Sequence, residues 1–232
     1  MTKPLERGRA AASGQAGRPS PARLFRAAVA GDAGACAPLV FASGVREFSF
    51  FLGESPERCI GFLKFAFASE YGRFSWRRHY VAVTESGDVC AVLAAHDGRK
   101  TRFDDLHVAW MLLRWFGPLR TVGMLLRGLV LESELPAPKR TQTLIAHCAT
   151  DERWRGCGAF SALFDDARSA GLFGAEAGRD VVLDVLVDNV RARGLYERLG
   201  FVAIPRTRAR SARLPKELAS VRMRFDAGDD AR

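Results

Sequence analysis

The stretch LIAHCATDERWRGCGAF, residues 144–160, decides the fold of this chain. It begins with an apolar run, 144–149, whose length suits a buried β-strand. From Phe160 onward apolar residues recur at i, i+3, i+4 and i+7, which indicates one face of a helix. A turn containing two glycines and two arginines joins them. The stretch therefore predicts a strand, a glycine turn and a helix in succession.

A strand followed by a glycine turn and a helix start is a recurrent way to hold a phosphate. Gly156 and Gly158 let the backbone approach closely, and Arg153 and Arg155 add positive charge. The first N–H groups of a helix lack intrahelical partners, and the helix dipole favours an anion there. The turn matches neither the G-x-G-x-x-G dinucleotide pattern nor a Walker loop. A tight turn without a ligand is the competing interpretation.

A second segment, LDVLVDNVRARGLYERLGF, occupies residues 183–201. The run 181–187 is rich in β-branched residues and predicts another buried strand. Asn189 with its neighbour Asp188 supplies a helix N-cap. An apolar helical face follows, and Gly200 is a natural helix stop before extended chain resumes.

Together the two segments resemble the GNAT superfamily of acetyl-CoA-dependent N-acetyltransferases. The later segment matches the family's N-x-x-A-x-x-L-Y-x-x-x-G-F helix at every signature position. The family's loop, Q/R-x-x-G-x-G/A, fits in a frame that starts at Arg153. A second frame starts at Arg155 and has Phe160 in place of the final Gly or Ala. We treat 153–160 as one loop and leave the frame open. The close match covers residues 142–203.

The resemblance implies an α/β fold with a mixed, mostly antiparallel central sheet and helices on both faces. It implies one domain over 21–226 and acetyl-CoA as co-substrate. The pantetheine arm would pair like a strand with the backbone of Cys148 to Thr150. The two strands 143–149 and 181–187 would splay apart to admit it. The residues expected to bind acetyl-CoA are Cys148, Ala149, Thr150, Arg153, Arg155, Gly156, Cys157, Gly158, Ala159, Phe160 and Asn189.

By the same resemblance, a primary amine of a small molecule or peptide attacks the thioester directly. The backbone N–H of Cys148 or Ala149 would stabilise the developing oxyanion. Tyr196 is the expected general acid, because the pKa values of a phenol and a thiol are comparable. The general base stays open among four residues, which are His147, Asp184, Glu132 and Glu134. A water relay without a protein base is the alternative. The alternative function is an acyl-CoA-binding or sensing module without acceptor chemistry.

Composition sets the broad class of this chain of 232 residues. The net charge of +9 is carried mostly by arginine, and we interpret it as a basic tail and an arginine-rich composition. Nucleic acid and stable membrane insertion are therefore not expected, and a homodimer stays open. The five cysteines form no C-x-x-C pair, so neither a disulfide framework nor a metal site is expected. A reducing cytoplasm is the expected compartment.

The N-terminal half predicts several further elements. Residues 1–20 have the composition of a disordered basic tail, and 21–53 look helical in pieces. Ser55 followed by Pro56 predicts a helix start. The run 79–94 alternates as a β-hairpin around a Gly-Asp turn.

The remaining segments are less regular. Residues 104–131 predict two amphipathic helices joined at Gly117-Pro118, which serve as a lid, as a membrane or dimer contact, or as extra core packing. The alternation at 221–225 suggests an edge strand. Residues 227–232 form a C-terminal tail.

Overall fold

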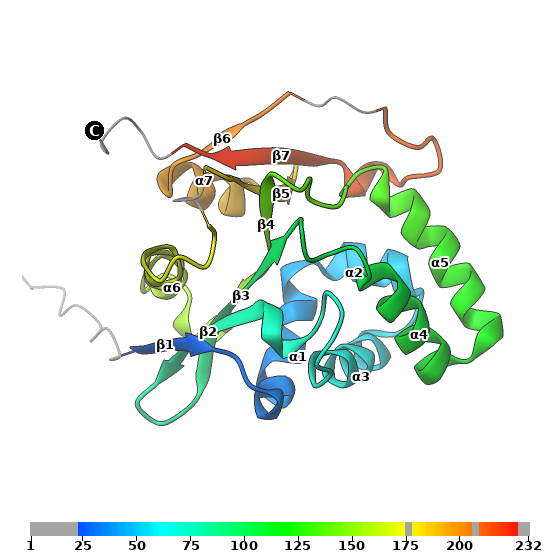
Figure 1. The fold of residues 1–232 in the computed structure, drawn as a ribbon, viewed down its shortest axis with the longest axis horizontal. Helices are drawn as coiled ribbons and strands as arrows, with labels where there is room; N and C mark the ends of the chain where they lie inside the picture. Colours follow the sequence, from blue (N-terminus) through cyan, green and yellow to red (C-terminus); the bar gives the residue numbers. More distant parts are fainter. Residues whose placement is uncertain (1–22, 175–177, 206–208, 227–232) are drawn as a thin grey trace, which may run out of the picture.

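The computed structural model describes residues 23–174, 178–205 and 209–226. The predicted tails 1–20 and 227–232 lie outside these residues. One seven-stranded sheet has the order β1-β2-β3-β4-β5-β7-β6 (Figure 1). Its strands are β1 (Arg23–Ala27), β2 (His79–Thr84), β3 (Val89–Asp97), β4 (Gln142–Thr150), β5 (Asp180–Leu186), β6 (Phe201–Ala203) and β7 (Ser220–Phe225). The β4–β5 pairing is parallel, and the other pairings are antiparallel.

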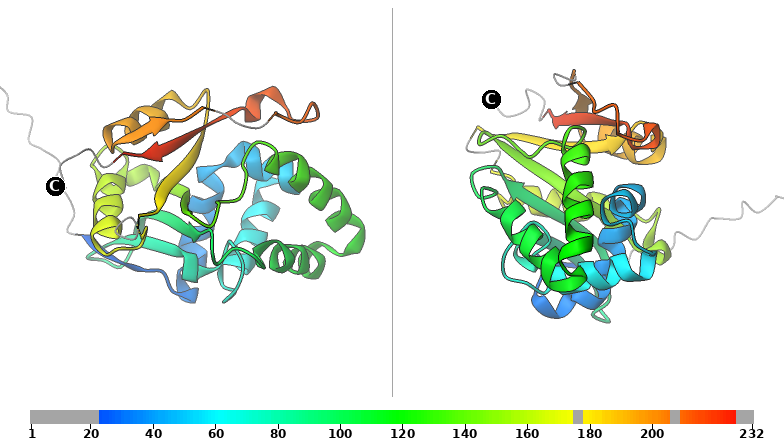
Figure 2. Two further views of the ribbon diagram at one scale, coloured as in Figure 1. Left: turned by 45° about the horizontal axis from the view of Figure 1, so that its top comes forward. Right: turned by 90° about the vertical axis from the view of Figure 1, so that its right-hand side faces the viewer.

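Helices cover both faces of this sheet. They are α1 (Ala33–Ser43), α2 (Val45–Leu52), α3 (Pro56–Phe67), α4 (Asp104–Phe116), α5 (Pro118–Glu132), α6 (Ala159–Ser169) and α7 (Val190–Arg198). The first core packs α1, α2 and α3 on one face, with Phe62 and Leu63 fully buried. The second packs α6 and α7 on the other face around Leu163 and Phe164. The expected mixed α/β fold with helices on both faces is confirmed (Figure 2).

The parallel pair β4 and β5 separates partway along its length. Pairing runs from Gln142 with Asp180 to Ile145 with Leu183, and there it ends. Beyond that point β4 stays paired with β3, but the register shifts, and His147 has a positive φ of 53°. A residue in this region bends a strand and redirects its side chains. The predicted splay between these strands is therefore present, with its opening at the carboxyl end of β4.

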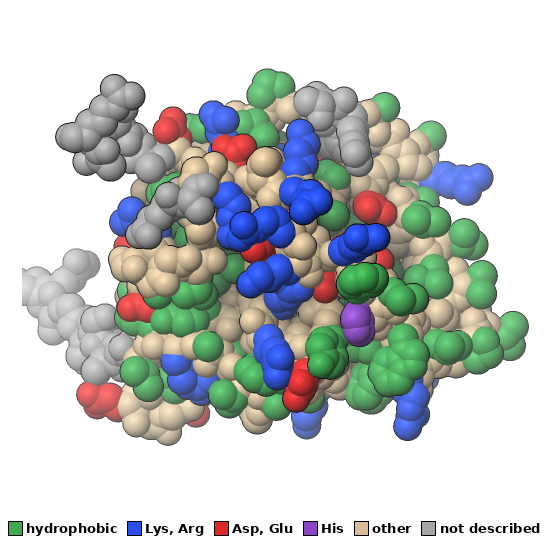
Figure 3. Space-filling model, in the orientation of Figure 1, with side chains coloured by type: hydrophobic (Ala, Val, Ile, Leu, Met, Phe, Trp, Pro, Cys, Tyr) green, Lys and Arg blue, Asp and Glu red, His purple; other side chains and the backbone are tan. Residues whose placement is uncertain are grey.

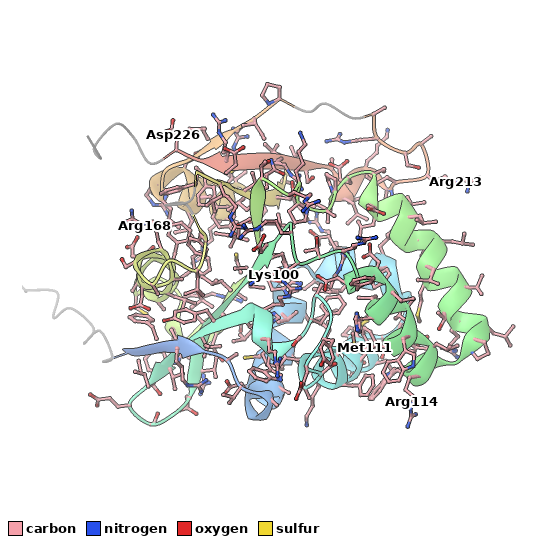
Figure 4. All side chains as sticks on the ribbon, viewed as in Figure 1. Lys100, Met111, Arg114, Arg168, Arg213 and Asp226 are labelled. Carbon is pink, nitrogen blue, oxygen red and sulfur yellow. The ribbon has the colours of Figure 1, made fainter. Side chains whose placement is uncertain are left out.

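Helices α4 and α5 form the predicted pair, and they meet at Gly117, whose φ is 79°. They extend the helical layer, since Trp115 stacks on Phe65 at 5.2 Å. Figure 4 shows Arg114 projecting outward from α4, whereas Met111 is buried. Apolar side chains also face outward, and they gather over this pair in Figure 3. They are Leu106, Trp110, Leu113, Leu119, Val122, Leu126 and Leu129.

No single helix within the described ranges is both long and apolar enough to cross a membrane. The segments Ala30–Ser43 and Val45–Leu52 pass that test only as a pair, and they are bent by 96° to each other.

Two local predictions were wrong. Residues 23–27, predicted within a helical region, form β1, because their backbone pairs antiparallel with β2 from Arg23–Thr84 to Ala27–Tyr80. Pairing with β2 outweighs the weak intrinsic helix propensity of a five-residue segment. The last strand, β7, is not an edge strand, because it lies between β5 and the short strand β6. Its alternation reflects two differently covered faces and not an exposed edge.

Candidate functional site

A cleft of about 540 Å³ opens where β4 leaves β5, and we call it the large cleft. Its walls come from the end of β4, the glycine turn, the start of α6, and α7. It is lined by Cys148, Ala149, Thr150, Trp154, Arg155, Gly156, Gly158, Ala159, Phe160, Ser161, Asn189, Arg191, Ala192, Leu195, Tyr196 and Arg198. Of the residues predicted to bind the co-substrate, Arg153 and Cys157 are not in this lining. The rest of that set and Tyr196 meet in one place, although they come from two distant segments.

The glycine turn presents an uncapped helix N-terminus to the large cleft. Gly156 and Gly158 have φ angles of 80° and 73°, which L side chains rarely adopt. Gly158 is the N-cap of α6, and no side chain caps that helix. A Cβ added at either glycine would meet no atom within 4 Å, so the turn faces open space. Its free N–H groups and the helix dipole suit an anion.

The arginines of the turn are held by local partners. Arg153 Nε donates to Asp151 at 2.9 Å, and this side chain is largely exposed. Arg155 donates to the Thr150 carbonyl at 3.3 Å and to Glu152 at 3.0 Å, so it lies along the cleft wall.

Two further arginines of the large cleft come from α7, and sequence reasoning missed them. Arg191 and Arg198 both line the cleft. Their i, i+7 spacing places them on one helical face, which is the signal that could have found them. Positive charge therefore borders the glycine turn from two elements.

Tyr196 lies at the inner end of the large cleft and is only 8% exposed. Its ring packs edge-on against Phe160 and Phe201, at centroid distances of 6.3 and 6.0 Å. Its hydroxyl interacts with the thiol of Cys148. Burial, and then the nearby thiol, raise the pKa of Tyr196 well above its ordinary value. The phenol therefore keeps its proton at neutral pH and can act as a donor.

Cys36, Cys59, Cys90, Cys148 and Cys157 form no disulfide with one another in the described part of the chain. Burial raises the pKa of Cys148 to about 12, so its thiol stays protonated at neutral pH. The Cys157 thiol donates to the Trp154 carbonyl at 2.8 Å and packs within the turn. Within the described part of the chain, no group of three or more His, Cys, Asp or Glu side chains could hold a metal ion.

Asn189 closes the other side of the large cleft as the N-cap of α7. Its Oδ1 accepts a hydrogen bond from the Ala192 N–H at 3.1 Å, which satisfies one orphan donor of that helix. The cap fixes the residue at the exit of β5, opposite the glycine turn. Sequence reasoning therefore placed both the residue and its capping role correctly.

A smaller cavity of about 200 Å³ lies beside β4, and we call it the small cavity. Residues 144–147 of β4 line it, whereas residues 148–150 line the large cleft. One short stretch of strand therefore forms a wall of both spaces. The remaining lining is Ser43, Gly44, Glu47, Phe48, Phe51, Phe74, Leu131, Leu135, Asp184 and Leu186.

A chain of hydrogen bonds fixes the histidine that lines the small cavity. His79 Nδ1 lies 2.8 Å from the Ser75 carbonyl, which can only accept. His79 Nε2 must then accept from His147 Nδ1, 3.0 Å away, while both rings are neutral. Burial lowers the pKa of His79 to about 4 and that of His147 well below its ordinary value. Both histidines are therefore neutral at pH 7.

Three of the four candidate bases now have definite surroundings. His147 lines the small cavity, as described above. Asp184 accepts two hydrogen bonds from Arg222, at 2.9 and 2.7 Å. Glu134 is buried and accepts from Arg210 Nε and Ser220 Oγ, each at 2.9 Å. The two carboxylates hold strands and loops together and are committed to those partners.

Glu47 is the carboxylate that sequence reasoning missed. It lies in the first turn of α2 and lines the small cavity. Its Oε2 is buried and has no hydrogen-bond partner among the described residues, and burial raises the pKa of this carboxyl. An acid inside the apolar run VREFSFFL, residues 45–52, was the available signal.

Comparison with known proteins identifies a family. The model of the acetyltransferase (GNAT) family matches residues 38–201. No curated protein sequence matches the chain.

Solved structures share this fold at low sequence identity. A crystal structure of an acetyltransferase is 20% identical with a TM-score of 0.60, covering 88% of this chain and 98% of that one. An N-acetyltransferase from Staphylococcus aureus Mu50 is 15% identical with a TM-score of 0.63, covering 87% and 100%. An agmatine N-acetyltransferase mutant is 17% identical with a TM-score of 0.50, covering 87% and 97%.

Proposed function

This chain belongs to the GNAT family of acetyltransferases and is an acetyl-CoA-dependent acyltransferase, and from that premise we propose its reaction. The acetyl group moves to a primary amine of a small molecule or peptide by direct attack. Tyr196 is the general acid. The single observation that carries the proposal is that Tyr196, the splayed end of β4 and the uncapped glycine turn line one cleft.

The large cleft fits the chemical parts of acetyl-CoA. The N–H groups at Gly156–Phe160 and the N-terminus of α6 suit the pyrophosphate. Arg155, Arg191 and Arg198 supply positive charge for the remaining phosphate. The end of β4, unpaired with β5 beyond Ile145, offers backbone groups to the pantetheine amides. Arg153 and Cys157, outside the lining, belong to the same proposed loop.

The catalytic roles follow from position and protonation. Acetyl-CoA supplies an activated thioester. The backbone N–H of Cys148 or Ala149 would stabilise negative charge that develops on the thioester oxygen, as fixed dipoles do in other acyl transfers. The Tyr196 phenol, kept protonated by burial, would give its proton to the departing sulfur. Its present partner, the Cys148 sulfur, is an acceptor of the same element.

The reaction is tested by following thiol release with acetyl-CoA and a panel of primary amines. We expect amine-dependent release and a product heavier by one acetyl group. A module that only binds acyl-CoA would bind the thioester and release no thiol with any amine. That outcome, with folded protein, would contradict the proposed transfer.

A further inference from the structure

We infer that the small cavity is the acceptor subsite, that it takes a primary amine with an apolar body, and that Glu47 receives its ammonium group. The inference rests on the proposed acetyl transfer. It names the class of acceptor that this chain's own side chains would recognise.

The small cavity lies where an acceptor must approach. Its β4 wall ends at His147, and the large cleft begins at the next residue, Cys148. The β4 backbone is irregular at this point, with the positive φ at His147 and the register shift against β3. An amine in the small cavity would therefore face the proposed oxyanion donors across one break in the strand.

Most of the cavity wall is apolar. Phe48, Phe51, Phe74, Leu131 and Leu135 line it, and they come from α2, the loop before β2, and the end of α5. The volume is about 200 Å³. A compact apolar amine fits this space. A second charge on the acceptor would find no second uncompensated carboxylate in this lining, because Asp184 is paired with Arg222.

Glu47 is complementary to the charged end of such an amine. Two carboxylates line the small cavity, and Asp184 is neutralised by Arg222. The neighbouring cation, Arg46, is bound to Asp188 and not to Glu47. Glu47 thus keeps a buried oxygen without a partner in the described structure. Buried polar atoms are nearly always satisfied, so this oxygen indicates a missing donor, and an ammonium group supplies one.

The same carboxylate balances the protons of the reaction. Glu47 takes one proton from the ammonium group, which leaves a neutral amine with a free lone pair. Burial raises the pKa of Glu47, which favours this transfer. The amine forms the new C–N bond, the C–S bond breaks, and Tyr196 protonates the sulfur. The second nitrogen proton returns to the tyrosine oxygen, and Glu47 releases its proton to solvent.

The test uses benzylamine, its uncharged analogue benzyl alcohol, and the dication putrescine, titrated into the full-length protein in the presence of CoA. We expect benzylamine to bind and the other two to bind more weakly. Glu47→Gln removes the charge and keeps the shape, so it should fold and bind acetyl-CoA normally. We expect this variant to lose at least about 30-fold in benzylamine affinity.

Two further variants sharpen the result. A Cβ at Gly44 would lie 3.3 Å from Glu47 Oε2, which is tighter than an ordinary van der Waals contact. Gly44→Ala should therefore displace the carboxylate and weaken benzylamine binding without changing any charge. Glu85→Gln, in the exposed turn after β2, is the matched control and should behave as wild type.

The outcomes separate this inference from the proposed function. Unchanged benzylamine affinity in Glu47→Gln, or tighter binding of putrescine than of benzylamine by the wild type, would overturn the inference. Normal acetyl-CoA binding in the same proteins would leave the acetyl transfer standing. A wild type that binds no acetyl-CoA would overturn both.

Discussion

The hydroxyl of Tyr196 on α7 interacts with the thiol of Cys148 on β4. The two residues are 48 positions apart and come from the two segments that carry the family motifs. Their contact joins the helix that bears the proposed acid to the strand that bears the proposed oxyanion donors. A protonated phenol thus lies next to a sulfur atom at the splayed end of β4.

Tyr196→Phe should lower kcat by about 100-fold or more, because general acid catalysis contributes that much. Acetyl-CoA affinity should change little, since the ring and its packing remain. The measurement is steady-state thiol release together with cofactor titration.

Tyr80→Phe is the control for this substitution. Tyr80 is also buried, its pKa is raised to about 12 by burial, and its hydroxyl donates to Asp166 at 2.7 Å. Its loss should cost about 1 kcal/mol of stability and leave kcat unchanged. Equal turnover in the wild type and Tyr196→Phe would remove the acid role.

Asn189 should serve both the fold and the cofactor. Asn189→Ala removes the cap of α7, which costs about 1 kcal/mol, and it also removes the proposed contact with the pantetheine arm. Asn189→Asp keeps the cap and loses the amide donor, so it should weaken acetyl-CoA binding with less effect on Tm.

Ser55→Ala is the matched control, because Ser55 caps α3 far from the large cleft. It should lower Tm and leave acetyl-CoA affinity unchanged. If all three variants bind acetyl-CoA as tightly as the wild type, Asn189 is a cap only.

The buried histidines predict acid sensitivity. The pKa of His79 is about 4 in the folded chain and about 6.5 when unfolded. The unfolded state therefore binds more protons between these values, so the free energy of unfolding falls as pH falls from 6.5 to 4. Protonation of His79 alone should lower the free energy of unfolding by about 2 kcal/mol between pH 7 and pH 5. Burial also lowers the pKa values of His96 and His147, so these residues should further lower the free energy of unfolding at acidic pH.

Urea unfolding at pH 7 and pH 5 measures this dependence. The variant His79→Asn cannot titrate at that position, so its two unfolding free energies should lie closer together than those of the wild type. An equal difference in both proteins would show that His79 does not contribute.

The local sequence predicted those parts of the fold where pattern and backbone chemistry agree. β4, the glycine turn and α6 follow from apolar periodicity and from glycines at positive φ, and α7 follows from its Asn189 cap. β1 could not be predicted, because a five-residue strand depends on its pairing with β2, more than 50 residues away.

Site residues that belong to a local sequence motif were predictable, whereas those placed in the site by tertiary packing were not. Tyr196 and Gly156 were found from local patterns, and they do line the large cleft. Arg191 and Arg198 were missed because charged residues on a helix are usually solvated, and only the position of α7 turns them toward the cleft. Glu47 was missed because its partnerless state exists only once α2 packs near β4.

Isothermal titration of three proteins with acetyl-CoA tests the proposed co-substrate site at the glycine turn. These are the wild type, Gly156→Glu and Gly87→Glu. Both glycines have positive φ, 80° and 88°, and open space around a Cβ, so the two variants carry similar backbone strain. They differ in that Gly156 faces the large cleft, whereas Gly87 lies in the turn between β2 and β3.

We predict micromolar binding by the wild type and Gly87→Glu, and its loss in Gly156→Glu, where a carboxylate meets the phosphates. Unchanged binding by folded Gly156→Glu, or none by the wild type, would contradict a co-substrate site at this turn.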